Sequence, residues 1–338
     1  MNSASKIYDP LYRWFEANKR VLPWRETSDP YKIWVSEIIL QQTRVQQGLE
    51  YYMRFVARFP DVATMARATE DEVLRLWQGL GYYTRARNMY KGAQMIAERW
   101  GGVFPTTFDD IRAIPGVGEY TAGAIASFAY DLPYPALDGN VYRVLARLND
   151  CDVVFDTTAG KKHFHSLAQR MLDEAHPRLF NSAIMELGAL QCVPREPDCT
   201  ACPLRHYCLA CAHHTVDVLP VRKPRPVVQD RELNYAIYLC PQTNEQGQKV
   251  VYTLLRQRTE KDIWHHLWEF PQQETSAPSA QRELTFTHLL SHRRLHATFR
   301  VYPVTSLPAI PDTITVAWTA LDDYALSRLT LRALQALQ

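Results

Sequence analysis

Four closely spaced cysteines constrain this chain more than any other feature. In "CVPREPDCTACPLRHYC", six, two and five residues separate the successive cysteines Cys192, Cys199, Cys202 and Cys208. Four thiolates at such short range can surround one metal centre, and both zinc and a [4Fe–4S] cluster accept four cysteines. Spacing alone favours zinc, although zinc sites usually pair two short knuckles and only Cys199 and Cys202 form one here. The pattern predicts a metal-binding loop and leaves the metal open.

Composition indicates a globular protein of a reducing compartment. The 338 residues are 46% hydrophobic and 22% charged, which allows two or three cores. Seven cysteines, an odd number and mostly bunched, argue against a secreted disulfide framework. No apolar run approaches the ~18 residues that span a membrane, and the N-terminal segment lacks the features of a secretion signal. We expect a cytoplasmic protein, and its net charge of +2 implies that any surface for nucleic acid is local.

The chain changes texture after the cysteines. The preceding part consists of short helical patterns such as "VYRVLARL", joined by tight turns. "VDVLPVRKPRPVVQD" has the prolines and basic residues of a linker, and "NYAIYLC", "KVVYTLLRQR" and "HATFRVYPV" predict strands before a final helix at roughly 322–338. We therefore predict an all-α region at 1–215, a linker at 216–231 and a smaller α+β domain at 232–338.

The stretch "WVSEIILQQT" places one carboxylate, Glu37, in an apolar run. An ionised carboxylate in apolar surroundings is costly, so Glu37 must be paired, exposed or protonated for a purpose. A solvent-facing glutamate near a helix start is the ordinary alternative.

Two further stretches combine turns with helix starts. In "IPGVGEYTAGAIASF", Gly116 and Gly118 permit positive φ and close backbone approach, and the N–H groups of the new helix can grip a phosphate. A plain turn between packed helices is the alternative. In "LDGNVYRVLAR", Asp138 and Asn140 precede a helix, where either residue can simply act as a cap.

Together these motifs resemble the endonuclease III and MutY family of DNA glycosylases. The cysteine pattern resembles the iron–sulfur loop of that family, "PGVGEYTAGAI" resembles its helix-hairpin-helix, and "LPWRE", "SEIILQQT" and "GLGYYTRAR" resemble the MutY pattern. The resemblance implies an all-α glycosylase with a six-helix core at about 30–135. Terminal helices and a cluster loop would come from 1–29 and 136–215. It also implies that the four cysteines hold a mainly structural [4Fe–4S] cluster.

The resemblance also implies catalytic roles. Glu37 and Asp138 fall on the catalytic glutamate and aspartate of the family. Relatives that also cleave the strand carry a lysine where this chain has Tyr120, and a phenol cannot form an imine with the sugar aldehyde. Glu37, its pKa raised by burial, would protonate adenine, and ionised Asp138 would stabilise the positive charge on the deoxyribose. Asn140 and Tyr120 would orient the aspartate and the departing base.

Contacts with DNA follow from the same resemblance. Arg25 lies where the family contacts adenine, and Gln42 and Tyr82 lie where side chains wedge into the helix near the lesion. Gly116 and Gly118 would grip the backbone. Double-stranded DNA containing A:8-oxoguanine or A:G mispairs is therefore the expected partner.

The C-terminal part resembles the Nudix-like domain of MutY proteins through "HLWEFPQQE" and its flanking strands. The acidic Nudix hydrolase motif is absent, so we expect no magnesium-dependent pyrophosphohydrolase. MutY proteins recognise 8-oxoguanine through a Phe-Ser-His loop, and "HLLSHRRLH" retains Ser291 and His292 but has Leu290 for the aromatic residue. Ser182 departs from the Glu or Gln that the family often has.

The expected function is hydrolysis of the N-glycosidic bond of adenine opposite 8-oxoguanine or guanine, without strand cleavage. One alternative is a related glycosylase for thymine or uracil in a G mismatch. Another is a catalytically idle lesion-binding protein. We expect a monomer, no association with membranes, and other repair proteins as candidate partners.

Overall fold

The structure, a computed structural model, describes residues 3–224, 227–243, 246–273, 280–290 and 292–337. Internal contacts divide the chain into two compact units. The first comprises Met1–Ala66 and Lys91–Pro224, and the second comprises Arg67–Tyr90 and Arg225–Gln338. Within the described ranges, no helix is both long enough and apolar enough to cross a membrane. The domain boundaries at 215 and 232 stay predictions.

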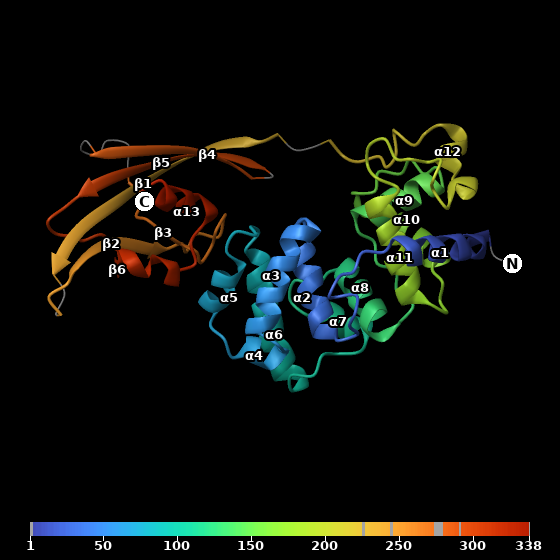
Figure 1. Cartoon of the computed structure of the whole chain (residues 1–338), viewed down its shortest axis with the longest axis horizontal. Coiled ribbons are helices and arrows are strands. Elements are labelled where there is room, and N and C mark those ends of the chain that lie inside the picture. Colours follow the sequence, from blue (N-terminus) through green and yellow to red (C-terminus); the bar gives the residue numbers. More distant parts are fainter. Residues whose placement is uncertain (1–2, 225–226, 244–245, 274–279, 291, 338) are drawn as a thin grey trace. The chain divides into compact units, whose positions relative to one another are not determined.

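Helices are the only regular secondary structure in the described residues of the first unit (Figure 1). Its elements are η1 (Ser3–Ile7), α1 (Tyr8–Asn18), α2 (Pro30–Leu40), α3 (Val45–Arg58), α4 (Val62–Ala66), the greater part of α6 (Thr84–Trp100), α7 (Phe108–Ala113), α8 (Glu119–Tyr130), α9 (Gly139–Leu148), α10 (Thr158–Met171), α11 (Pro177–Leu190), η2 (Arg205–Tyr207) and α12 (Leu209–His213). Side-chain caps fix several helix starts, because they satisfy N–H groups that have no partner within the helix. Asp29 accepts a hydrogen bond from the N–H of Tyr31 at the start of α2, and Thr157 accepts one from Gly160 at the start of α10.

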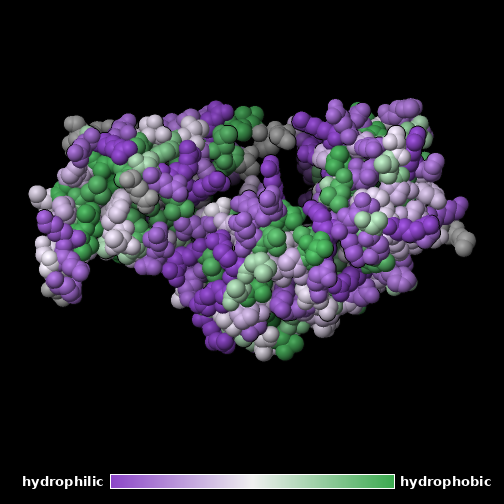
Figure 2. Space-filling view, viewed as in Figure 1, coloured by the Kyte–Doolittle hydropathy of each residue, from purple (hydrophilic) through white to green (hydrophobic). Residues whose placement is uncertain are grey.

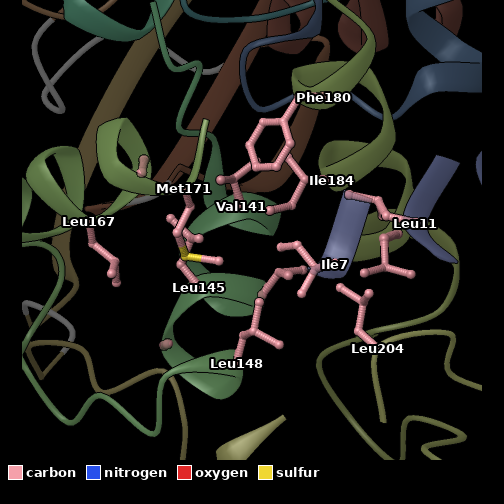
Figure 3. Close-up of a cluster of buried hydrophobic side chains, with 14 of the residues drawn as sticks. Ile7, Leu11, Val141, Leu145, Leu148, Leu167, Met171, Phe180, Ile184 and Leu204 are labelled. Carbon is pink, nitrogen blue, oxygen red and sulfur yellow. The ribbon is translucent and has the colours of Figure 1, made fainter. Parts of the chain in front are cut away.

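Helix α9 lies in one hydrophobic core of this unit. Its apolar side chains Val141, Leu145 and Leu148 are among side chains from the neighbouring helices α1, α10 and α11 (Figure 3). The helical spacing predicted from "VYRVLARL" is confirmed. Its first turn, which carries the candidate aspartate, is therefore anchored by the core.

Helix α2 is buried on nearly every side, since it packs against both α3 and α8. Its apolar residues Trp34, Val35 and Ile39 are fully buried. A helix that is hydrophobic all round is an interior helix rather than a surface helix. A carboxylate on α2 is therefore placed in the protein interior by the packing of its neighbours.

The second unit contains a six-stranded sheet (Figure 1). Its elements are α5 (Glu70–Trp77), the first residues of α6, β1 (Gln229–Thr243), β2 (Lys249–Gln257), β3 (Trp268–Glu269), β4 (Arg282–Leu289), β5 (Arg293–Pro303), β6 (Thr313–Ala317), η3 (Trp318–Asp323) and α13 (Arg328–Gln335). The strand order is β3-β2-β1-β5-β4, with β6 on β2, and β1 pairs with β5 in parallel. Leu329 and Ala333 of α13 pack with strand residues such as Phe299. Apolar residues also gather over the strands in the space-filling view (Figure 2).

The predicted strands are confirmed, and the predicted final helix is corrected. That helix begins at Arg328 rather than near Asp322. The hydroxyl of Ser327 caps it by accepting the N–H of Thr330 at 3.1 Å. The preceding residue, Leu326, is held extended by a bridge to Trp268. At the other end of the unit, β1 begins within the predicted linker 216–231.

Gly188 allows α11 to approach the first turn of α9. A Cβ atom on Gly188 would lie 2.8 Å from the Cβ of Asn140 and 2.9 Å from its carbonyl oxygen, whereas a Cβ atom on Gly139 would meet nothing within 4 Å. We expect Gly188→Ala to lower the free energy of unfolding by about 1–3 kcal/mol, because backbone has to shift. Gly139→Ala should change it by less than about 0.5 kcal/mol. Urea denaturation of both variants checks this, and equal losses would contradict it.

Candidate active site

A cavity of about 620 Å³ in the first unit brings six of the predicted site residues together. It is lined by residues of α1, α2, α8, α11 and the start of α9. All four predicted catalytic residues line it, and so do two of the predicted DNA contacts. These six are Glu37, Tyr120, Asp138, Asn140, Arg25 and Gln42.

Glu37 is buried in the wall of the cavity, with 7% of its surface exposed. The hydroxyl of Tyr120 donates a hydrogen bond to Oε2 of Glu37 at 2.5 Å. Burial raises the pKa of Glu37 to about 7; the charge of Asp138 adds to the rise, while the Tyr120 hydrogen bond and Arg25 oppose it. This carboxyl group can therefore keep a proton near neutral pH.

Asp138 is the N-cap residue of α9 and also faces the cavity. Its Oδ1 accepts the N–H groups of Asn140 at 2.9 Å and Val141 at 2.8 Å. Its Oδ2 accepts the side-chain amide of Asn140 at 2.8 Å. Burial raises the pKa of Asp138, and the hydrogen bonds from Val141 and Asn140 oppose that rise. The capping role and the cavity-lining position therefore belong to the same carboxylate, whose orientation is fixed by three donors.

Glu186 is a buried carboxylate in the cavity wall that the sequence analysis missed. Its side chain has no exposed surface, and its Oε2 accepts hydrogen bonds from Arg20 at 2.6 Å and Arg25 at 2.7 Å. Burial alone would raise the pKa of Glu186, but the hydrogen bonds of Arg20 and Arg25 outweigh it and lower the pKa to about 2. Arg25 thus lines the cavity with its guanidinium fixed by Glu186. A lone carboxylate in the apolar run "AIMELGAL" was the available signal.

Two buried arginines of α9, also missed, tie this helix to the cysteine loop. Arg143 donates to the side-chain oxygen of Asn140 at 2.9 Å and to the carbonyl of Cys192 at 2.7 Å. Arg147 donates to Sγ of Cys192 at 3.4 Å and to the carbonyl of Val193 at 2.8 Å. Two arginines four residues apart in an apolar helix were the available signal.

The four predicted metal ligands gather in the loop beyond α11. Burial raises the pKa of Cys202 to about 12, and the neighbouring thiols of Cys192, Cys208 and Cys199 add to the rise. Backbone N–H groups of Leu204 and Cys211 point at the sulfur atoms of Cys202 and Cys208, respectively. Such N–H groups stabilise thiolates that bind iron.

The cysteine loop has the donors for a metal–sulfur group: several thiols in mutual range, with amides directed at two of them. Among the described residues, however, no three His, Cys, Asp or Glu side chains already stand in a metal-ion arrangement. The identity of the group therefore rests on the donor set.

Of the two hairpin glycines, Gly116 has the positive φ that the sequence analysis allowed for, and Gly118 does not. Gly116 has a φ of 80°, the left-handed conformation that favours glycine. Gly118 has a φ of −94° because it is the extended N-cap residue of α8. No heavy atom lies within 4 Å of the Cβ position of Gly118, so close approach from outside remains open there.

The remaining predicted DNA contacts lie in the second unit. Tyr82 is 47% exposed and has a φ of 49°. His292 is exposed where β4 turns into β5, beside the hydrogen bond from the N–H of Leu290 to the carbonyl of Arg293 at 2.8 Å. Ser291 lies outside the described residues. The structure thus places these residues in a different unit from the cavity.

The raised pKa of Glu37 predicts a pH-dependent cost to stability. Between the ordinary pKa of about 4.5 and about 7, the folded chain binds the proton more tightly, so its stability falls as the pH rises through this window. Glu37→Gln stays neutral at every pH. We therefore expect the difference in unfolding free energy between this variant and the wild type to shift in favour of the variant by on the order of 2–3 kcal/mol when the pH is raised from 4 to 8. Urea denaturation at both pH values measures this. A difference between the two proteins that does not change with pH would contradict it.

Comparison with known proteins identifies relatives of both parts. The sequence model of the HhH-GPD superfamily base excision DNA repair protein matches residues 35–169, and that of the NUDIX domain matches residues 231–336. An adenine DNA glycosylase of Buchnera aphidicola subsp. Baizongia pistaciae is 34% identical over 271 residues, which cover 79% of this chain and 73% of that protein. The adenine DNA glycosylase of Mus musculus is 40% identical over 233 residues, which cover 66% of this chain and 45% of that protein.

Solved structures share the helical fold. A thermostable thymine-DNA glycosylase matches with a TM-score of 0.58 and 24% identity over 62% of this chain and 97% of its own. A trapped endonuclease III–DNA covalent intermediate matches with a TM-score of 0.54 and 21% identity over 63% of this chain and 99% of its own. The predicted family resemblance and the predicted fold class, a helical glycosylase core with a Nudix-like α+β domain, are confirmed. The chain belongs to the adenine DNA glycosylase family of base excision DNA repair enzymes.

Proposed function

We propose that this chain hydrolyses the N-glycosidic bond of adenine paired with 8-oxoguanine or guanine in duplex DNA. The observation that carries the proposal is the cavity in which Glu37, with a pKa of about 7, lies with Asp138. The names of the relatives support adenine as the base. The DNA-bound endonuclease III structures of the same fold support DNA as the substrate.

Glu37 supplies the proton in this scheme. Adenine leaves poorly as an anion, so protonation of a ring nitrogen lowers the barrier to breaking its bond to the sugar. Tyr120 occupies Oε2 of Glu37 as a donor, which leaves the proton to Oε1. A carboxylic acid with a pKa near the working pH is populated in the protonated form and still transfers its proton readily.

Asp138 stabilises the sugar. As the bond breaks, positive charge develops on the deoxyribose, and a carboxylate with a fixed orientation lowers the energy of that charge. Asn140 holds Oδ2 of Asp138 at 2.8 Å. Water then adds to the sugar carbon, and its proton returns to a carboxylate. Since Tyr120 replaces an amine, and Lys19 in the cavity wall is paired with Glu16 at 2.6 Å, the scheme contains no imine and no strand cleavage.

Recognition of DNA uses both units. Arg25 and Gln42 line the cavity that would receive the extruded adenine. The open backbone at Gly118, beside Gly116, offers N–H groups to a phosphate. Exposed Tyr82 would insert into the base stack, and Ser291 and His292 would contact the lesion. The enzyme would act as a monomer in the cytoplasm, at the nucleoid in a bacterium, alongside other repair proteins.

A [4Fe–4S] cluster held by Cys192, Cys199, Cys202 and Cys208 is part of the proposal. Arg147 and the backbone N–H groups of the loop would stabilise its thiolates. Because Arg143 and Arg147 join the loop to α9, the cluster would act as a structural brace for the helix that carries Asp138. Zinc is the alternative that spacing alone favoured.

Base release is tested by single-turnover reactions on duplexes labelled on the adenine strand. Adenine is placed opposite 8-oxoguanine, guanine or thymine, and each sample is analysed with and without hot alkali. We expect breaks only after alkali, fastest opposite 8-oxoguanine. Breaks without alkali would show an amine nucleophile, and release of thymine or uracil from G mismatches instead of adenine would favour the other glycosylase.

Glu37→Gln separates an enzyme from an idle lesion-binding protein. The variant should lose at least about 100-fold in single-turnover rate, the usual size of general acid catalysis, and should still bind the duplex. Glu50→Gln, on the exposed side of α3, is the matched control and should keep the full rate. A Glu37→Gln variant that releases adenine at the wild-type rate would overturn the mechanism.

The metal is tested by absorption and metal content. A protein purified without oxygen should absorb near ~400 nm and contain about four iron atoms per chain. Cys199→Ser should lose much of this absorption. Cys151→Ser should retain it, because Cys151 is outside the ligand set and lies 3.4 Å from His163. One zinc per chain without visible absorption would contradict the proposed cluster.

A further inference from the structure

The segment 67–90 lies inside the match to the base excision repair family, yet it is compact with the C-terminal residues from 225 onward. It carries α5, the turn at 79–82 and the first residues of α6. The exposed Tyr82, which would insert into DNA, is part of this turn. Some of the contacts that fix the turn therefore come from the Nudix-like part of the chain.

Tyr83 provides the most direct of these contacts. It is 4% exposed, and its hydroxyl donates to the carbonyl of Leu326 at 3.4 Å. The same oxygen accepts the N–H of Gly79 at 3.3 Å. One hydroxyl group thus joins Leu326, two residues before α13, to the first residue of the turn.

Arg87 and Glu70 hold the rest of the segment. Arg87 follows Tyr83 by one helical turn and donates to the carbonyl of His265. Glu70, on α5, pairs with Nδ1 of His266 at 2.5 Å. His266 has a φ of 66°, a conformation that residues other than glycine adopt only where their surroundings hold them. Contacts from α5 and α6 therefore converge on the His265–His266 turn.

The turn itself is strained and needs support. Gly79, Gly81 and Tyr82 all have positive φ, at 97°, 74° and 49°. A tyrosine in this region costs on the order of 1 kcal/mol, and the conformation persists only when the surrounding structure fixes it. The indole of Trp77 donates to the carbonyl of Gly81 at 2.9 Å. The strained backbone of the turn holds the aromatic ring of Tyr82 in an exposed position.

The side chain of Arg85 contacts the ring of Tyr82. Its guanidinium lies 5.0 Å from the ring centroid of Trp77 and 5.6 Å from that of Tyr82. Burial lowers the pKa of Arg85 to about 10, because the charged guanidinium loses contact with water. Tyr82 is thus oriented by the stack as well as by its backbone.

We propose that Tyr83 is a positioning residue through which the C-terminal part of the chain holds Tyr82 ready for insertion into DNA. Its hydroxyl is hydrogen-bonded to both Leu326 and Gly79. It therefore connects the C-terminal part of the chain to the turn that carries Tyr82. The inference rests on the proposed function in one respect, the insertion of Tyr82. It assigns to the C-terminal part a role in shaping the duplex in addition to contact with the lesion.

Tyr83→Phe removes the hydroxyl and little else. We expect amide hydrogen exchange of the 77–83 peptide to be at least about fivefold faster in this variant, because Gly79 N–H loses its partner. Tyr90→Phe is the matched control, since Tyr90 on the same helix donates to the carbonyl of Ala68 at 2.9 Å, outside the C-terminal part. Unchanged exchange in Tyr83→Phe would overturn the proposal, whatever the protein does with DNA.

A double-mutant cycle tests action through Tyr82. Duplex affinity is measured with a 2′-fluoro adenosine opposite 8-oxoguanine, which binds without being cleaved. Tyr83→Phe should weaken binding about three- to tenfold in the wild type and less than about twofold in Tyr82→Ala. Single-turnover rates at saturating enzyme should stay within about twofold. Equal losses in both backgrounds would mean a merely structural effect and overturn the proposal, whereas a wild type that releases no adenine would count against the proposed function.

Discussion

The burial of one carboxyl group, Glu37, is the constraint on which the site depends. Because α2 packs against α3 and α8, it carries Glu37 into the interior, where an ionised carboxylate is poorly solvated. The hydrogen bond from Tyr120 opposes the rise in the pKa without cancelling it, and the group titrates near neutrality. Above the pKa of Glu37, the buried carboxylate is ionised and the folded protein is less stable. The same burial makes Glu37 a proton donor near neutral pH. The cavity, the hairpin helix α8 and the aspartate of α9 are arranged around that donor.

Helix α9 joins the chemistry to the rest of the fold. Asp138 caps the helix. The buried side chains of Arg143 and Arg147 on α9 bind the cysteine loop. The apolar side chains of α9 fill the core shown in Figure 3. Gly188 of α11 admits its first turn at close range. A metal–sulfur group in the loop would therefore influence the aspartate through Arg143, which bonds to both Cys192 and Asn140, rather than by contact with substrate.

Local chemistry and family pattern in the sequence predicted the helices, the strands and six of the residues that line the cavity. The lone carboxylate in an apolar run was the right signal for Glu37, but the same signal marks Glu186, with the opposite outcome. The hydrogen bonds of Arg20 and Arg25 outweigh the burial of Glu186 and lower its pKa to about 2, whereas the hydrogen bond of Tyr120 does not outweigh the burial of Glu37, whose pKa rises to about 7. The partners of Glu186 are more than 160 residues away in the chain, so the sequence alone could not distinguish these cases. Long-range pairing also determined where the final helix begins. The bridge from Leu326 to Trp268 holds Leu326 in an extended conformation, so the helix starts later than the sequence predicted.

The central claim is that Glu37 carries a proton near neutral pH, and its titration tests that claim most directly. Carbon-13 NMR of the glutamate side-chain carboxyls, with Glu37→Gln used to assign the signal, would give the midpoint for this one group. We predict a midpoint of about 7, well above the ordinary glutamate value of about 4.5. A midpoint near the ordinary value would mean that Glu37 is ionised when the enzyme works, and the proposed proton donor would have to be another group.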